Sequence, residues 1–165
     1  MASTANISQA LDAKDRKILD LVQRDGKLPQ AEIGKRVGLS TATVNERLKK
    51  LEHAGIIRRY VAIVDPRAVG VSVTAFVEVF IEHPRHEPAF IARVRAMDEV
   101  QEVHHITGEF SVLLKVRAAG MEALQKLLIH QLNALEGVRQ TRTVIALSTS
   151  KEESYISTGA EGGTE

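Results

Sequence analysis

The first third of the chain shows apolar residues at helical spacing. One segment begins near Asp12, a good N-cap residue, and ends near Gly26, which suits a left-handed helix stop. The same spacing recurs in residues 30–37 and 41–54, separated by a tight turn. The inward positions are Ile18, Leu19, Leu21, Val22, Ala31, Ile33, Val37, Val44, Leu48 and Leu51. The pattern predicts a small domain of three short helices.

After Gly55 the periodicity changes to that of strands. Residues 56–64 (IIRRYVAIV) are β-branched and predict a wing or connecting strand. Further along, four strands and two helices are expected, in the order 72–82 (strand), 86–97 (helix), 100–106 and 110–116 (strands), 120–135 (helix) and 138–148 (strand). This βαββαβ order suits an α+β fold in which both helices cover one face of an antiparallel sheet. The expected divisions are 1–10 (disordered), 11–57 (helical domain), 58–70 (linker), 71–150 (sheet domain) and 151–165 (disordered tail).

The first strand of the predicted sheet has apolar residues on both faces. Residues 73, 75, 77, 79 and 81 alternate onto one face, and Phe76 and Phe80 lie on the other. Two helices cover only one face, so the second face calls for burial, most simply against a copy of itself. The alternative is a partly exposed sheet. The pattern therefore favours a homodimer.

Charge is distributed unevenly behind a net charge of +1. Residues 1–64 hold 12 Lys+Arg and 7 Asp+Glu, whereas residues 65–165 hold 10 and 14. A basic half suggests contact with a polyanion, although an ordinary solvated surface would show the same balance. There are no Cys residues, which excludes disulfides and thiolate metal sites. No secretory signal or membrane span is apparent, so a cytoplasmic location is expected.

The second and third predicted helices have the spacing of a helix-turn-helix, whose second helix reads bases in the major groove. Outward positions of that helix carry hydroxyl, amide and basic groups, which suit contacts to phosphates and base edges. A protein-binding module would look similar, but the basic excess lies on this segment. The candidate DNA-binding residues are Ser40, Thr41, Thr43, Asn45, Arg47, Lys49, Lys50, Arg58 and Arg59.

Three motifs occur in the order VGLS, RLKKLEHAGII and TGEFSVLLKV. Together they indicate a family resemblance that covers roughly residues 11–151. The chain resembles the Lrp/AsnC (feast/famine) transcription regulators of bacteria and archaea. The resemblance implies a winged helix-turn-helix joined to a ferredoxin-like βαββαβ domain that binds a small-molecule effector, such as an amino acid, between dimers. It also implies double-stranded DNA as a partner, nucleoid association, and homo-oligomers from dimers to tetramers or octameric discs.

By the same resemblance, the effector site involves the TGEFS turn and the last strand, with Thr107, Gly108, Glu109, Phe110, Ser111, Thr141 and Thr143 as candidates. The family typically has Gly-Asp-Tyr-Asp where this chain has Gly108-Glu109-Phe110-Ser111. A carboxylate pairs naturally with a ligand ammonium, and Ser111 lacks that charge. The hypothesis is that the effector is unusual, is held differently through Glu109, or is absent.

Two other functions remain open from the residues. An architectural, effector-independent DNA-binding protein would share all these features. A sirohaem decarboxylase of Lrp/AsnC type would use His104, His105 and Arg142 at a tetrapyrrole. Adjacent residues of a strand point to opposite faces, so His104 and His105 cannot chelate one metal ion together. No enzymatic activity, metal or cofactor is expected, nor any membrane partner.

Overall fold

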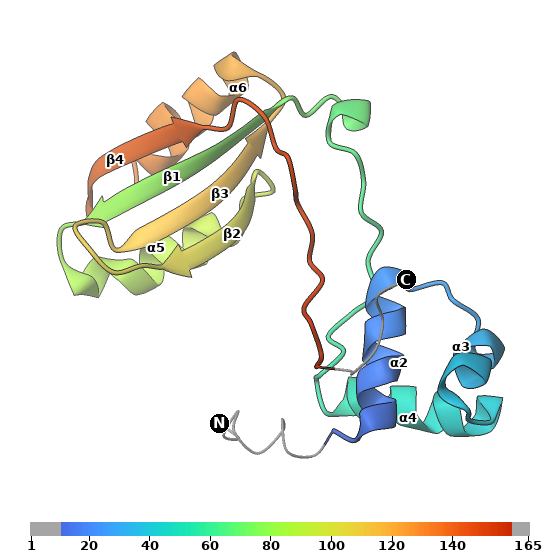
Figure 1. Ribbon diagram of the computed structural model, residues 1–165. Coiled ribbons are helices and arrows are strands. Elements are labelled where there is room, and N and C mark those ends of the chain that lie inside the picture. Colours follow the sequence, from blue (N-terminus) through green and yellow to red (C-terminus); the bar gives the residue numbers. More distant parts are fainter. Residues whose placement is uncertain (1–10, 160–165) are drawn as a thin grey trace. The chain divides into compact units, whose positions relative to one another are not determined.

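The computed structural model describes residues 11–159, so the predicted disorder of residues 1–10 and 160–165 lies outside the described part (Figure 1). The chain forms two compact units. Unit 1 combines the N-terminal part of the chain, up to residue 63, with the C-terminal part from residue 152. Unit 2 contains residues 64–151. The backbone therefore passes between the units twice.

Unit 1 is built from the three predicted helices, α2 (Ala13–Arg24), α3 (Gln30–Val37) and α4 (Thr41–His53). Asp12 begins α2 with a capping box, in which its side chain accepts from the backbone N–H of Asp15, 2.7 Å away. The predicted left-handed stop at Gly26 is wrong, because α2 ends at Arg24 and its C-cap residue, Asp25, is extended. Buried residues from all three helices form one core: Ile18, Leu19, Ile33, Val37, Val44, Leu48 and Leu51.

The turn between α3 and α4 depends on two glycines. Gly38 ends α3 in the left-handed conformation, with φ of 67°. At Gly34, a Cβ atom would lie 2.6 Å from the carbonyl oxygen of Leu39, so only glycine lets α3 approach this backbone. The Leu39 N–H donates to the Gly34 carbonyl across the same contact, at 2.9 Å. These contacts set how α4 follows α3.

The predicted strand over residues 56–64 is wrong. After α4 the backbone N–H groups of Ile56 and Ile57 donate to the Leu51 carbonyl, and the chain then continues without strand pairing. Val61 and Ile63 are 64% and 81% exposed. β-branched residues favour a strand only where a neighbouring strand and a packed face receive them, and the described residues supply neither here.

Unit 2 contains a four-stranded antiparallel sheet with the order β2-β3-β1-β4. Its elements are η1 (Arg67–Val69), β1 (Val73–Ile81), η2 (Pro84–His86), α5 (Glu87–Val94), β2 (Val100–His105), β3 (Val112–Ala118), α6 (Met121–Lys126), η3 (Leu127–Leu132) and β4 (Val138–Ile145). The inward residues of β1 and β3 pack against α5, α6 and η3 in one core. This confirms the predicted α+β, ferredoxin-like fold.

The second predicted helix of unit 2 changes its winding midway. It is α-helical in α6 and becomes a π-helix in η3. Leu127 and Leu132 are both buried, although they are five positions apart. The wider π-turn brings such positions onto one face, so the change of winding turns Leu132 toward the core.

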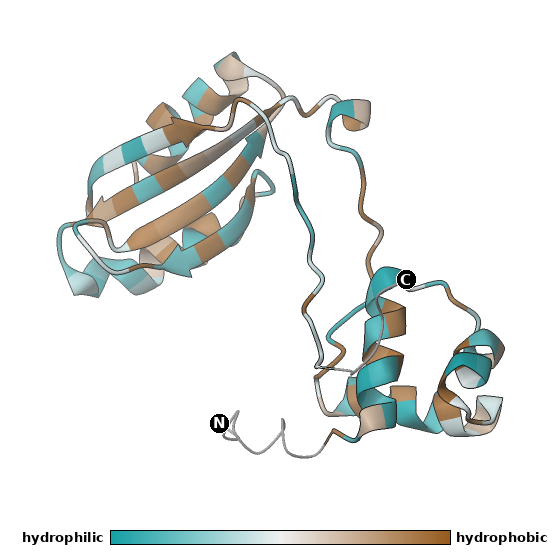
Figure 2. Ribbon diagram, in the orientation of Figure 1, coloured by the Kyte–Doolittle hydropathy of each residue, from teal (hydrophilic) through white to brown (hydrophobic). Residues whose placement is uncertain are grey.

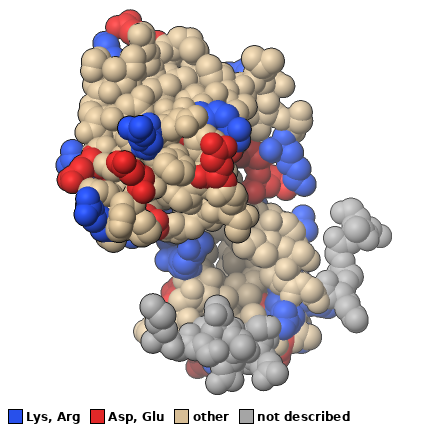
Figure 3. All heavy atoms as spheres, turned by 90° about the vertical axis from the view of Figure 1, so that its left-hand side faces the viewer, with Lys and Arg blue, Asp and Glu red and all other residues tan. Residues whose placement is uncertain are grey.

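The other face of the sheet is the one predicted to need a partner. Along β1, residues 75, 77, 79 and 81 are buried, whereas Phe76 on the opposite face is 37% exposed. Val144 of β4 pairs in register with Phe76 and is 54% exposed. Figure 2 shows apolar residues along both central strands. Figure 3 views this unit from the left-hand side of Figure 1, and on that side acidic and basic side chains are interspersed with uncharged surface. The predicted two-faced apolar pattern of β1 is confirmed.

Residues 151–159, the described part of the predicted tail, contain no helix or strand. Residues 155–158 form hydrogen bonds with side chains and backbone of α2. Low apolar content predicted a free chain, but polar groups on the outer face of α2 supply its partners. None of the helices in the described chain is long and apolar enough to cross a membrane.

Candidate functional sites

The N-terminal end of α4 carries the hydroxyl residues proposed to contact DNA. Ser40 caps the helix, accepting from the Thr43 N–H at 3.1 Å, and its hydroxyl lies 2.8 Å from that of Thr43. Thr41 is exposed beside them. Ser40 and Thr43 therefore have a structural role as a cap while remaining at the solvent-facing start of the helix.

Four basic residues follow on α4 and just beyond it: Lys49, Lys50, Arg58 and Arg59. All four are exposed. Among the described residues, none of them takes part in an ion pair, whereas Arg36 on α3 is paired with Glu32 at 2.9 Å. Unpaired cations on a surface are available to neutralise phosphates.

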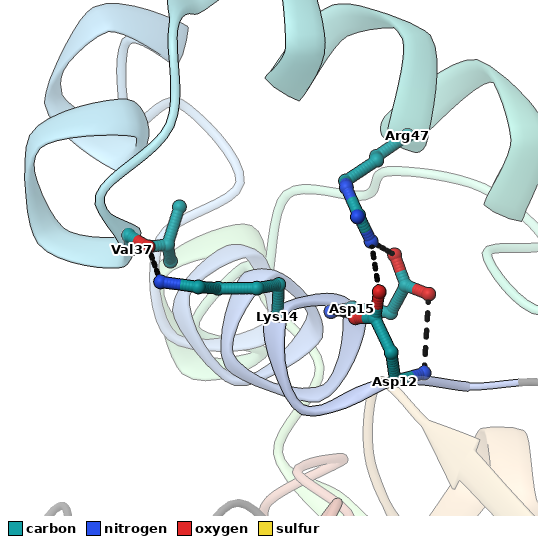
Figure 4. Close-up of polar contacts among 5 residues, drawn as sticks. All are labelled: Asp12, Lys14, Asp15, Val37 and Arg47. Atoms are coloured by element: carbon teal, nitrogen blue, oxygen red, sulfur yellow. Dashed lines mark hydrogen bonds and ion pairs between the residues drawn. The ribbon is translucent and has the colours of Figure 1, made fainter.

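Arg47, on the same helix, is placed differently from these four (Figure 4). Its guanidinium lies 2.7 Å from a carboxylate oxygen of Asp12 and 2.7 Å from one of Asp15, and its side chain is only 28% exposed. Asp15 is 6% exposed, and its other oxygen accepts from the Asp12 N–H. Two ion pairs, from Arg47 to Asp12 and to Asp15, thus connect the middle of α4 to the start of α2.

The electrostatics of this cluster favour the charged forms of Asp12 and Arg47. The Asp15 N–H, and next the Arg47 side chain, lower the pKa of Asp12 below its usual value. Hydrogen bonds to the carboxylates of Asp12 and Asp15 raise the pKa of Arg47. In the same view, the Lys14 ammonium donates to the Val37 carbonyl at the end of α3. Sequence spacing did not reveal the contacts of Arg47 and Lys14, because they join residues more than twenty positions apart.

A cavity of about 330 Å³ lies within unit 1 beside α4. Asn45 and Lys49 line it together with Glu52 and Tyr60. The Tyr60 hydroxyl donates to Glu52 at 3.2 Å; burial of the ring, with this hydrogen bond, raises the pKa of Tyr60. Tyr60 therefore attaches the start of the linker to the helical core.

The TGEFS turn connects β2 and β3. The Ile106 N–H donates to the Ser111 carbonyl at 3.0 Å, and the Ser111 N–H donates to the Val79 carbonyl of β1 at 3.1 Å. Thr107, Gly108 and Glu109 at its tip are exposed. The Ser111 hydroxyl oxygen is buried and has no hydrogen-bond partner within the described chain.

Phe110 and Arg142 form the second part of this region. Phe110 is 5% exposed, and the Arg142 guanidinium lies over its ring, 4.9 Å from the centroid. Arg142 also pairs with Glu78 of β1, and this ion pair lowers the pKa of Glu78. The hydrogen bond to Glu78 is the main cause of the raised pKa of Arg142, and the charge of Glu109 adds to it. Sequence reasoning missed Glu78, whose signal is its position opposite Arg142 in the strand register.

Thr141 and Thr143 lie on the opposite side of the sheet from Arg142. They pair with Val79 and Val77, which face the helices. The Thr141 hydroxyl donates to the Asn133 side chain at 3.0 Å. The structure thus brings together Glu78, Phe110 and Arg142, and it places the two threonines apart from them.

The histidines considered for a tetrapyrrole have carboxylate partners of their own. His104 lies 3.1 Å from Glu102, and His105 lies 3.1 Å from Glu87 of α5. Arg142 belongs to β4, at the other edge of the sheet from β2. Three strand spacings separate the two edges, about 14 Å. Among residues 11–159, no group of three potential metal-ligating side chains is found.

Comparison with known proteins connects both units to characterised families. Residues 74–156 match the Lrp/AsnC ligand binding domain. Residues 11–58 match a winged helix-turn-helix DNA-binding domain. The two matches together span most of the described chain.

Curated relatives match over nearly their whole lengths. The chain is 38% identical to the leucine-responsive regulatory protein of Salmonella typhimurium over 148 residues, 88% of this chain and 90% of that protein. It is 37% identical to the HTH-type transcriptional regulator FL11 of Pyrococcus abyssi over 143 residues, 87% and 93% of the two chains.

Solved structures show the same likeness. A transcriptional regulator of Neisseria meningitidis in complex with L-methionine has a TM-score of 0.85 and 33% identity, covering 89% of this chain and 96% of that one. A feast or famine regulatory protein of M. tuberculosis complexed with L-methionine has a TM-score of 0.83 and 33% identity, with 89% and 99% covered. The fold, the helix-turn-helix and these likenesses agree: the chain belongs to the Lrp/AsnC family of DNA-binding transcriptional regulators.

Proposed function

We propose that this regulator binds paired DNA half-sites through α4 of two copies and that a small molecule held near Arg142 modulates binding. The proposed DNA contact is supported by the surface of α4 and of the residues that directly follow it. Its N-terminal hydroxyls are solvent-facing, and four exposed cations carry no ion pair among the described residues. The half-sites would lie on one face of the duplex, one helical turn or a multiple apart.

Phosphate contacts and base contacts divide between different side chains in this proposal. Lys50 neutralises phosphate, so Lys50→Ala weakens binding to every duplex and lowers the salt dependence by about one counterion. Arg47 reads a base only if it leaves Asp12 and Asp15. Arg47→Ala then costs about 1–3 kcal/mol of discrimination between operator and scrambled DNA.

Fluorescence anisotropy with a duplex selected in vitro from the gene's upstream DNA tests this division. Each variant is titrated against the selected duplex and a scrambled one at several salt concentrations. Equal losses on both duplexes for both variants would refute the assignment of Arg47. Absence of any binding at low salt would refute the DNA-binding proposal as a whole.

The second copy is proposed to cover the outer face of the sheet. Phe76 and Val144 are adjacent there and are exposed in the single chain. A charge at the centre of such a face prevents its burial, so Phe76→Glu produces monomers in sedimentation velocity experiments. The exposed Glu82→Gln, just beyond β1, is the matched control and keeps the oligomeric state. A dimer that survives Phe76→Glu would place the interface elsewhere.

The proposed effector is an amino acid or a related metabolite. L-Methionine is bound in two of the similar regulators. Here Arg142 offers a guanidinium for a ligand carboxylate, and exposed Glu109 offers a carboxylate for an ammonium, replacing the charge that Ser111 lacks. A coupling of about 1–3 kcal/mol between sites changes DNA affinity some 5- to 150-fold.

The effector is tested by repeating the anisotropy titration with each of the twenty amino acids at millimolar concentration. A response that Glu109→Gln abolishes and Glu122→Gln preserves supports the assignment of Glu109.

The missing carboxylate at Ser111 favours a second candidate, an architectural DNA-binding protein without an effector. That function is supported if none of the twenty alters binding and coverage of long DNA is cooperative with weak sequence preference.

A further inference from the structure

The described C-terminal segment, residues 152–159, lies along the outer face of α2. Arg16, Asp20 and Arg24 are spaced four residues apart, so they share one side of this helix. The opposite side holds Ile18 and Leu19 in the core. The segment therefore uses a face of α2 that the helical core leaves open.

Tyr155 is the anchor of this contact. Its hydroxyl donates to the Asp20 carboxylate, and the Arg24 guanidinium lies over its ring, 4.5 Å from the centroid. Arg24 and Asp20 are themselves paired at 3.2 Å. One aromatic side chain thus completes a three-residue cluster with a carboxylate and a cation on α2.

Two further pairs of hydrogen bonds continue the contact. The Gln23 side-chain amide accepts from the Ile156 N–H at 2.9 Å and donates to the Ile156 carbonyl at 3.0 Å. The Thr158 carbonyl accepts from Arg16 at 2.7 Å, and the Thr158 hydroxyl donates to the Arg16 carbonyl at 3.1 Å. Because backbone and side-chain groups are matched in both directions, the segment binds in one register.

The lengths of the two chain passages between the units determine how far apart the units can move while this contact is formed. Fully extended, the chain from the end of β4 at Ile145 to Tyr155 spans at most about 36 Å. The first passage between the units, from Tyr60 on the helical core to Val73 at the start of β1, spans at most about 47 Å. The C-terminal passage is the shorter of the two, so it sets the upper limit on the distance between the two units.

We propose that residues 146–158 form a strap, fastened to α2 by Tyr155, that limits how far the DNA-binding unit moves from the sheet unit. While the strap is fastened, the longer linker cannot be fully extended. When Tyr155 leaves α2, the DNA-binding unit is held by the linker alone and gains reach. This property concerns the free protein and stands apart from the proposed DNA sites and effector.

The test measures the distance between the two units by double electron–electron resonance spectroscopy. The chain has no cysteine, so nitroxide labels are confined to the two exposed positions Lys27→Cys in unit 1 and Ala92→Cys on α5. Labelled chains are diluted with unlabelled ones, so that each assembly holds one labelled copy. Neither DNA nor an effector is added, so the result is independent of the proposed function.

Three changes in this labelled background give distinct expectations. Tyr155→Ala broadens the distance distribution and raises its upper limit. Gly-Ser-Gly inserted after Ser148 keeps the anchor and raises the upper limit by at most about 11 Å. The same insertion after Ala62, in the longer linker, leaves the limit unchanged. A distribution that ignores Tyr155→Ala, or that responds only to the linker insertion, would overturn the strap.

Two more measurements examine the anchor itself. In a Tyr60→Phe background, Tyr155 is the remaining tyrosine of the chain, and its ionisation is followed by absorbance. The hydrogen bond to Asp20 raises the pKa of Tyr155, so Asp20→Asn lowers that pKa and the exposed Glu46→Gln does not. A short dipolar distance between Lys27→Cys of one chain and Ser157→Cys of another would show docking between copies and overturn a strap within one chain.

Discussion

Arg47 shows how a residue's chemistry and its place in the fold differ at the scale of single residues. An arginine on the outer face of a recognition helix is typical of base reading, and sequence patterns predicted that role. In the structure, two carboxylates from the start of α2 occupy its guanidinium. Periodicity predicts which side of a helix a residue lies on, but not which distant side chain reaches it.

Loss of Arg47 is expected to weaken unit 1 as well as DNA recognition. Asp15 is almost fully buried, and Arg47→Ala leaves its carboxylate without a cation. The expected loss of unfolding free energy is about 1–3 kcal/mol. Urea unfolding followed by circular dichroism measures it, with Lys50→Ala as the exposed, unpaired control. Equal stability of the two variants would show that the carboxylates are satisfied without Arg47.

Acid is expected to weaken the same unit through two depressed carboxyl groups. The Asp15 N–H and Arg47 lower the pKa of Asp12, and the hydrogen bond from Tyr155 lowers the pKa of Asp20. Each contribution is fully present above the unfolded value of about 3.8 and is lost as pH falls through the lower folded value. The urea midpoint therefore falls as the pH is lowered below about 4, and it falls less in Asp12→Asn. A fall of the same size in Asp12→Asn would exclude Asp12 as a source.

At the scale of elements, the sequence predicted helices and sheet strands well and connections poorly. The three helices of unit 1 and the central strands β1 and β3 each bury a periodic apolar face, and that period is visible in the residues. Residues 56–64 have the composition of a strand but no neighbour to pair with. Residues 155–158 look like a free tail because the groups that bind them lie on α2, far away in the sequence. Pairing with distant partners is the part that local patterns omit.

The α3–α4 turn is expected to tolerate no side chain at Gly34. The Cβ atom of Gly34→Ala would approach the Leu39 carbonyl oxygen to 2.6 Å, which forces the two helices apart. Overpacking of this kind typically costs about 1–3 kcal/mol. Gly26→Ala, whose Cβ would meet its neighbours at 3.4 Å or more, is the control in the same unit. Thermal unfolding distinguishes them, and equal midpoints would mean that the turn relaxes without loss.

At the scale of the whole molecule, the described chain has two separate hydrophobic cores. Ile33→Ala in unit 1 and Leu114→Ala in unit 2 each remove a buried side chain, with an expected loss of about 2–5 kcal/mol. Hydrogen exchange measured by mass spectrometry should show lost protection only in the unit that carries the change. Loss of protection in both units from either variant would mean that the two cores unfold as one.

The composition of unit 1 has a consequence for the order in which the protein is made. Helices α2–α4 leave the ribosome early, whereas Tyr155 is added only after the whole of unit 2 has been synthesised. At typical elongation rates the interval is roughly 5–20 s. During that time the nascent chain contains the sequence of all three helices, but Asp20 and Gln23 lack their partners on the tail. During synthesis the protein therefore passes through a stage in which the DNA-binding helices are exposed before the contact between Tyr155 and α2 can form.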